Sequence, residues 1–67
     1  MTTLIQYHKE TKNLALFETD GLYWIGSYFP FATHQTAEPD YLKIGFESKD
    51  INYMIDILSA ISPKDYP

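Results

Sequence analysis

The sequence contains no cysteine, no arginine and no valine. Without cysteine, it has no disulfide framework, no thiolate metal ligand and no cysteine nucleophile. Without arginine, it lacks the side chain best suited to bidentate contacts with phosphate or guanine. The first six residues carry no basic charge and no apolar run, and no stretch approaches the ~20 apolar residues of a membrane span. We therefore expect a cytoplasmic protein without a signal peptide.

The length and charge narrow the range of partners. The 67 residues suffice for a single domain over 1–67, and a hydrophobic content of 45% is enough for it to fold. Nine acidic residues against five lysines give a formal net charge of −4. That charge repels the phosphates that supply most non-specific nucleic-acid affinity, so duplex nucleic acid is not an expected partner. It favours a basic protein, including proteins that handle nucleic acids.

The dipeptide Asp20-Gly21 lies between two apolar runs, 14–17 and 22–25. This arrangement predicts a β-hairpin with a two-residue type I′ turn, which needs positive φ at both turn residues. The turn fixes the register, with Phe17 opposite Trp24, and opposed residues share a face of the sheet. Two faces follow: an aliphatic face with Leu14, Leu16, Glu18, Tyr23, Ile25 and Ser27, and an aromatic face with Ala15, Phe17, Trp24, Gly26 and Tyr28.

Two more strands are predicted. Residues 4–9 form the first, and if the polar loop 10–13 closes as a hairpin, Tyr7 pairs with Leu16 and Ile5 with Glu18. Ile5 and Tyr7 then lie on the aliphatic face, and Gln6 and His8 on the aromatic face. Residues 41–47 alternate as a fourth strand, with Leu42, Ile44 and Phe46 on one side. Between these regions, two prolines and no alternation predict a long loop over 30–40.

A helix is predicted from about residue 50 to 61, capped by Ser48 or Asp50 and stopped by Pro63. Its apolar residues recur at helical spacing and form a core stripe of Ile51, Met54, Ile55, Leu58 and Ile61. The simplest arrangement is an α+β fold (ββββα): a four-stranded antiparallel meander sheet with one C-terminal helix packed on the aliphatic face.

Few residues suggest catalysis. His34, Glu38 and Asp40 lie close in sequence, but their spacing matches no known metal-ligand pattern. Ser27 and His8 are predicted on opposite faces, so they cannot form a nucleophile–base pair. No glycine-rich phosphate loop is present. We therefore predict no enzymatic activity, no catalytic residues, no metal and no cofactor.

The aromatic face is the strongest lead to a function, because large exposed aromatic patches mark binding surfaces. We predict a partner-binding surface that combines aromatic residues with an acidic rim. The alternative is that the 30–40 loop, with Phe29 and Phe31 at its start, folds over this face and makes a second small core. The predicted partner-binding residues are Phe17, Trp24, Tyr28, Tyr41, Glu38, Asp40 and Glu47.

A second apolar stripe on the helix, made of Tyr53, Ile57 and Ala60, exceeds what a single flat sheet covers. It predicts a homodimer interface. The alternative is a strongly curved sheet that wraps around the helix.

In its order of elements, the C-terminal half resembles the small single-stranded-DNA-binding domains of the transcriptional coactivator and Whirly type. In those domains a strand leads through a short polar turn into an amphipathic helix that helps to form a dimer. Residues 42–48, followed by a helix at Asp50, are similar in pattern. In size, acidity and lack of catalytic equipment the chain also resembles the small inhibitor proteins that phages and mobile elements make, such as anti-CRISPR proteins.

These features favour a small acidic, non-enzymatic module that acts as an inhibitor or adaptor on a larger basic, nucleic-acid-handling protein. The alternative is a single-stranded nucleic-acid-binding domain that stacks bases on the sheet aromatics, as a homodimer. That function would require Lys9, Lys12 and Lys43 to contact phosphates. A small enzyme ranks last.

Overall fold

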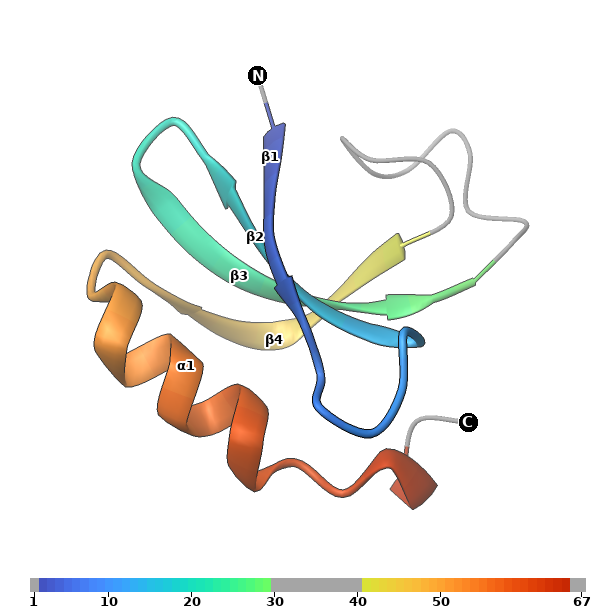
Figure 1. Cartoon of the computed structure of the whole chain (residues 1–67). Helices are drawn as coiled ribbons and strands as arrows, with labels where there is room; N and C mark the ends of the chain where they lie inside the picture. Colours follow the sequence, from blue (N-terminus) through green and yellow to red (C-terminus); the bar gives the residue numbers. More distant parts are fainter. Residues whose placement is uncertain (1, 30–40, 66–67) are drawn as a thin grey trace.

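The computed structural model describes residues 2–29 and 41–65. Four antiparallel strands form one sheet in the order β1-β2-β3-β4, and a helix follows them (Figure 1). The helix lies along one side of the curved sheet and contacts β2, β3 and β4. The predicted α+β meander with one C-terminal helix is therefore confirmed. The elements are β1 (Thr2–Tyr7), β2 (Leu14–Thr19), β3 (Leu22–Tyr28), β4 (Tyr41–Ser48), α1 (Ile51–Ala60) and a short 3-10 turn, η1 (Pro63–Asp65).

The β2–β3 hairpin has the predicted turn and register. Asp20 and Gly21 both have positive φ, 53° and 87°. Phe17 pairs with Trp24, and the pairing continues without a shift from Thr19↔Leu22 to Leu14↔Ser27. The Glu18 carboxylate closes the turn by accepting a hydrogen bond from the Gly21 N–H at 2.6 Å. The turn sequence alone was therefore enough to define this pair of strands.

The predicted register between β1 and β2 is wrong, because β1 contains a bulge. Leu4 pairs with Phe17, but Gln6 pairs with Leu16 and Tyr7 with Ala15, so Ile5 is the extra residue. One extra residue reverses the faces of all residues that follow it. Ile5 still packs on the aliphatic core, as predicted. Tyr7 instead shares the aromatic face with Ala15, and the His8 ring reaches the end of the helix.

Strand β4 has a second irregularity, next to β3. Between the pairs Gly26↔Lys43 and Trp24↔Glu47, β3 has one residue and β4 has three. Gly45 lies in this bulge with φ 103°, a conformation that favours glycine. Ile44 packs on the aliphatic core, as predicted, whereas Phe46 is exposed. Strand β4 therefore has two extra residues, and an even number leaves the faces of the residues beyond them unchanged. Lys43 and Glu47 both lie on the aromatic face.

The main core lies between the aliphatic face and α1. Its fully buried side chains come from β2, β3 and the helix: Leu14, Leu16, Ile25, Met54 and Leu58. Burial of each such side chain stabilises the fold by about 1.5–3 kcal/mol. Asp50 is the N-cap, and its carboxylate accepts hydrogen bonds from the N–H groups of Asn52 (3.0 Å) and Tyr53 (3.2 Å). Among the described elements, no helix has the length and apolar character that crossing a membrane requires.

Candidate protein-binding face

The aromatic face holds a second, smaller core on the opposite side of the sheet from the helix. Phe17 and Trp24 are each only 4% exposed, and their rings stack with centroids 4.7 Å apart. The half-buried Tyr41 packs on Phe17 in a T-shaped arrangement, with a centroid distance of 5.1 Å. Ala15 lies fully buried in the same cluster. Phe17 and Trp24 are therefore buried, whereas the 30–40 loop of the second-core alternative lies outside the described residues.

Gly26 makes this packing possible. A Cβ atom at this position would lie 3.0 Å from Cζ3 of Trp24, 3.1 Å from Cβ of Tyr41 and 3.2 Å from Cε2 of Phe17. These distances are shorter than ordinary carbon–carbon contacts of ~3.5–4.0 Å. The glycine is therefore required by the close approach of the aromatic side chains to the β3 backbone.

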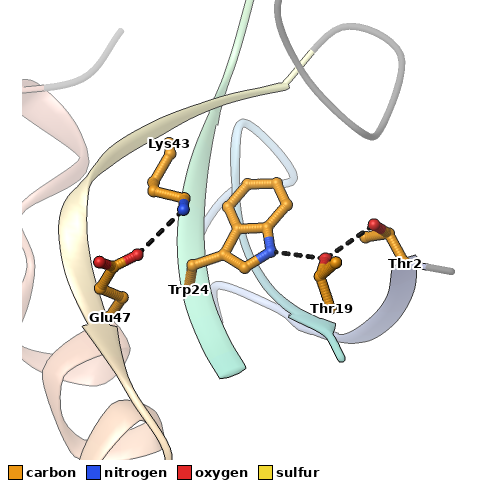
Figure 2. A network of polar contacts seen from close by, with 5 residues as sticks. All are labelled: Thr2, Thr19, Trp24, Lys43 and Glu47. Atoms are coloured by element: carbon orange, nitrogen blue, oxygen red, sulfur yellow. Dashed lines mark hydrogen bonds and ion pairs between the residues drawn. The ribbon is translucent and has the colours of Figure 1, made fainter. Parts of the chain in front are cut away.

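Polar groups surround the Trp24 ring (Figure 2). The indole Nε1–H donates a hydrogen bond to Thr19 Oγ1 at 3.0 Å, and that hydroxyl lies 2.7 Å from Thr2 Oγ1. On the other side, the Lys43 ammonium lies 5.8 Å from the ring centroid and forms a 2.9 Å ion pair with Glu47. The buried indole thus has its N–H satisfied, which is what a core tryptophan needs.

Three large apolar side chains stay exposed around this second core, and we call them the exposed rim: Leu4, Tyr7 and Tyr28. They are 42%, 40% and 43% exposed. Cross-strand pairing places each on the aromatic face, because Leu4 pairs with Phe17, Tyr7 with Ala15 and Tyr28 with Tyr41. The aromatic face therefore has a buried centre and an accessible edge.

The β1–β2 loop contributes a lysine to the same face. The Lys12 ammonium lies 5.6 Å from the Tyr7 ring centroid, and the Lys12 carbonyl accepts a hydrogen bond from the Tyr41 hydroxyl at 2.5 Å. The Tyr41 and Tyr28 rings meet edge to face, 5.6 Å apart. Through these contacts, Tyr41 supports the exposed side chain of Tyr28, and Lys12 supports that of Tyr7.

The predicted partner-binding residues therefore divide into three groups. Phe17 and Trp24 are buried, and Tyr41 is half-buried between them and Tyr28. Tyr28 and Glu47 are exposed on the aromatic face. Glu38 and Asp40 lie outside the described residues, as does the 30–40 loop. Sequence reasoning missed Tyr7, because nothing in the pattern around Ile5 indicated a bulge.

The predicted dimer stripe on α1 is only partly accessible. Tyr53 is 56% exposed and Ala60 is exposed, whereas Ile57 is half-buried and packs on the aliphatic core. Ile57 therefore has a role within the fold. The structure leaves Tyr53 and Ala60 as the accessible members of this stripe.

His8 is buried, and its Nε2 lies 3.0 Å from the Ile61 carbonyl at the end of the helix. In residues 2–29 and 41–65, no three histidine or carboxylate side chains come together in a way that could hold a metal ion. The candidate set of His34, Glu38 and Asp40 lies outside those ranges. Comparison with protein families, curated proteins and solved structures finds no match for this chain.

Proposed function

We propose that this chain is a small non-enzymatic protein-binding module, an inhibitor or adaptor that docks on a larger basic protein. The observation that carries this proposal is the exposed rim, in which Leu4, Tyr7 and Tyr28 surround a buried aromatic core on one face of the sheet. Apolar side chains gathered on one face of a small domain are typical of an interaction surface. The net charge of −4 makes a basic partner electrostatically complementary.

In this proposal the two parts of the aromatic face have different roles. The rim makes the contact, with Tyr28 as its main aromatic side chain, because tyrosine buries a large area at little cost in side-chain entropy. The Phe17–Trp24 pair lies beneath the contact and keeps the sheet rigid. The acidic charges speed the approach of a basic partner.

The proposed setting is the cytoplasm, where a chain without disulfides is at no disadvantage. The proposed partner handles nucleic acid, since such proteins carry basic grooves. Small acidic inhibitors of this type are a form that phages and mobile elements use. The size and charge of the chain support this part of the proposal.

An affinity capture from a nuclease-treated lysate of the organism that encodes the chain tests the proposal. The baits are the wild type, Tyr28→Ala and, as a matched control, Tyr53→Ala. Both replace an exposed tyrosine, on the aromatic face and on the helix respectively. We expect a protein that is captured by the wild type and Tyr53→Ala but is lost with Tyr28→Ala. Raising the salt concentration should also weaken the capture.

Other patterns contradict the proposal. Equal capture by all three baits would exclude the rim as the contact surface. Loss of capture with Tyr53→Ala alone would show that the contact surface is on the helix. Urea unfolding of each variant shows that it is folded, so loss of capture can be assigned to loss of contact.

Single-stranded nucleic acid is a second candidate, because Lys12 and Lys43 both lie against aromatic rings of this face. A homodimer through Tyr53 and Ala60 would double the number of lysines along the strand. Three observations weigh against it: the buried Trp24, the Glu47 carboxylate paired with Lys43, and the net negative charge. Titration with a dT oligonucleotide at low salt, followed by tryptophan fluorescence and sedimentation, would detect both binding and dimerisation.

A further inference from the structure

His8 is a buried polar side chain that the proposed function does not use. It follows β1 directly and is 4% exposed. Its backbone N–H donates a hydrogen bond to the Leu14 carbonyl at 2.8 Å, which ties the start of the β1–β2 loop to β2. A charged histidine in such a site would need a partner that compensates its lost hydration.

The two ring nitrogens of His8 have different neighbours. The backbone N–H of Glu10 donates to Nδ1 at 3.0 Å. A backbone amide can only donate, so Nδ1 must carry a lone pair and no proton. The proton of the neutral ring is then on Nε2, which donates to the Ile61 carbonyl at 3.0 Å. The hydrogen bonds therefore select one neutral tautomer.

This ring connects two segments that are 53 residues apart in the chain. Ile61 is the C-cap of α1, and its N–H donates to the Ile57 carbonyl at 3.1 Å. Its side chain packs on the aliphatic core. Figure 1 shows the β1–β2 loop beside the segment that leaves the helix. The imidazole thus holds the C-terminal end of α1 against the sheet.

The segments that meet at His8 carry exposed charged side chains, and within the described residues none of them forms an ion pair with the imidazole. These side chains are Lys9, Glu10 and Lys12 on the loop, Asp56 on α1, and Lys64 and Asp65 on η1. The Ile61 carbonyl, at the helix C-terminus, lies 3.0 Å from Nε2 and attracts a positive charge.

We infer that His8 is an acid-sensitive latch, closed while its ring is neutral. A proton added at Nδ1 would point at the Glu10 N–H, so two donors would face each other and that hydrogen bond would be lost. The same proton would place a cation in a nearly closed site. One helix-end carbonyl does not replace both the lost hydrogen bond and the lost hydration. The ring therefore leaves its site on protonation, and the C-terminal end of α1 is released from the sheet.

Nuclear magnetic resonance of the whole chain tests the latch between about pH 8 and about pH 4, a range that spans imidazole titration. The ring signals of His8 report its protonation and tautomer. The hydrogen-exchange protection factor of the Ile61 amide reports the helix end, and that of Ile25 reports the core. Once the ring is protonated, we expect the protection of Ile61 to fall about tenfold relative to that of Ile25, which corresponds to loss of about one hydrogen bond.

Two substitutions separate the latch from general acid effects. His8→Gln keeps a side-chain N–H donor for the Ile61 carbonyl but cannot titrate, so its relative protection should not depend on pH. His34→Gln removes the other histidine and should behave like the wild type. A protonated His8 with undiminished protection at Ile61, or a ring that stays neutral throughout, would overturn the proposal. The wild-type data decide the matter even if His8→Gln does not fold.

Discussion

Replacing Gly26 by alanine tests how the aromatic face is built. The new Cβ would lie 3.0–3.2 Å from one atom each of Trp24, Tyr41 and Phe17. Gly26 is not among the glycines with positive φ, so alanine can adopt its backbone conformation and the effect comes from packing. The Phe17 and Trp24 rings stack on each other, so neither can move away freely. The substitution therefore has to displace the buried aromatic pair.

The expected magnitude combines two opposing effects. Overpacking of a well-packed site typically costs about 1–3 kcal/mol. Replacing glycine with alanine also restricts the unfolded chain, which stabilises the fold by about 0.4–1 kcal/mol. Taking values near the middle of both ranges, we expect Gly26→Ala to lower the free energy of unfolding by about 1–2 kcal/mol. That is a large share of the roughly 3–5 kcal/mol that a core of this size supplies.

Urea unfolding followed by circular dichroism measures this change. With a slope of about 1 kcal/mol per molar urea for a small domain, the midpoint should fall by about 1–2 M. The double variant with Phe17→Leu is the internal control, because leucine lacks the Cε2 atom that the alanine would meet. Gly26→Ala should cost less in that background than alone. An unchanged or raised midpoint for Gly26→Ala, or an identical cost in both backgrounds, would refute the packing argument.

Two further predictions concern the polar contacts. Thr19→Val removes the acceptor of the Trp24 Nε1–H and leaves a buried donor unsatisfied. The free energy of unfolding, measured with urea, should therefore fall by about 1–3 kcal/mol. Thr19→Ser keeps the hydroxyl and should retain most of the wild-type stability. Asp50→Ala removes the N-cap of α1 and should lower stability by about 0.5–2 kcal/mol in the same assay, with a loss of helical circular dichroism, whereas Asp50→Asn should be close to wild type. Equal stability of Asp50→Ala and Asp50→Asn would show that the cap hydrogen bonds contribute nothing.

The parts of the fold that could be predicted from the sequence are those with local sequence signals. Asp20-Gly21 has one favourable turn geometry, and that turn fixes every pair of β2 with β3. The spacing of Met54 and Leu58 similarly identified the buried stripe of α1. In both cases the determining residues lie next to each other or within one helical turn. No contact distant in sequence was needed.

The parts of the fold that could not be predicted from the sequence are those with β-bulges. The sequence of β1 predicts a strand, but nothing in Leu4, Ile5 and Gln6 marks the position of a bulge. The bulge follows from packing, since Ile5 enters the aliphatic core while Leu4 stays opposite Phe17. The position of the bulge therefore depends on contacts with β2 and α1, which are distant along the chain. The bulge in β4 differs in this respect, because it contains Gly45, and an isolated glycine within a strand is a known mark of a bulge.

The bulge at Ile5 accounts both for the wrong β1–β2 register and for the absence of Tyr7 from the predicted binding residues. A regular β1 would place Tyr7 on the aliphatic face and the His8 ring away from Ile61. With the bulge, Tyr7 joins the exposed rim and His8 reaches the helix end. The same extra residue therefore creates one edge of the proposed binding surface and the proposed latch, on opposite sides of the sheet. Deleting Ile5 should affect both together, whereas Tyr28→Ala should affect the binding surface alone.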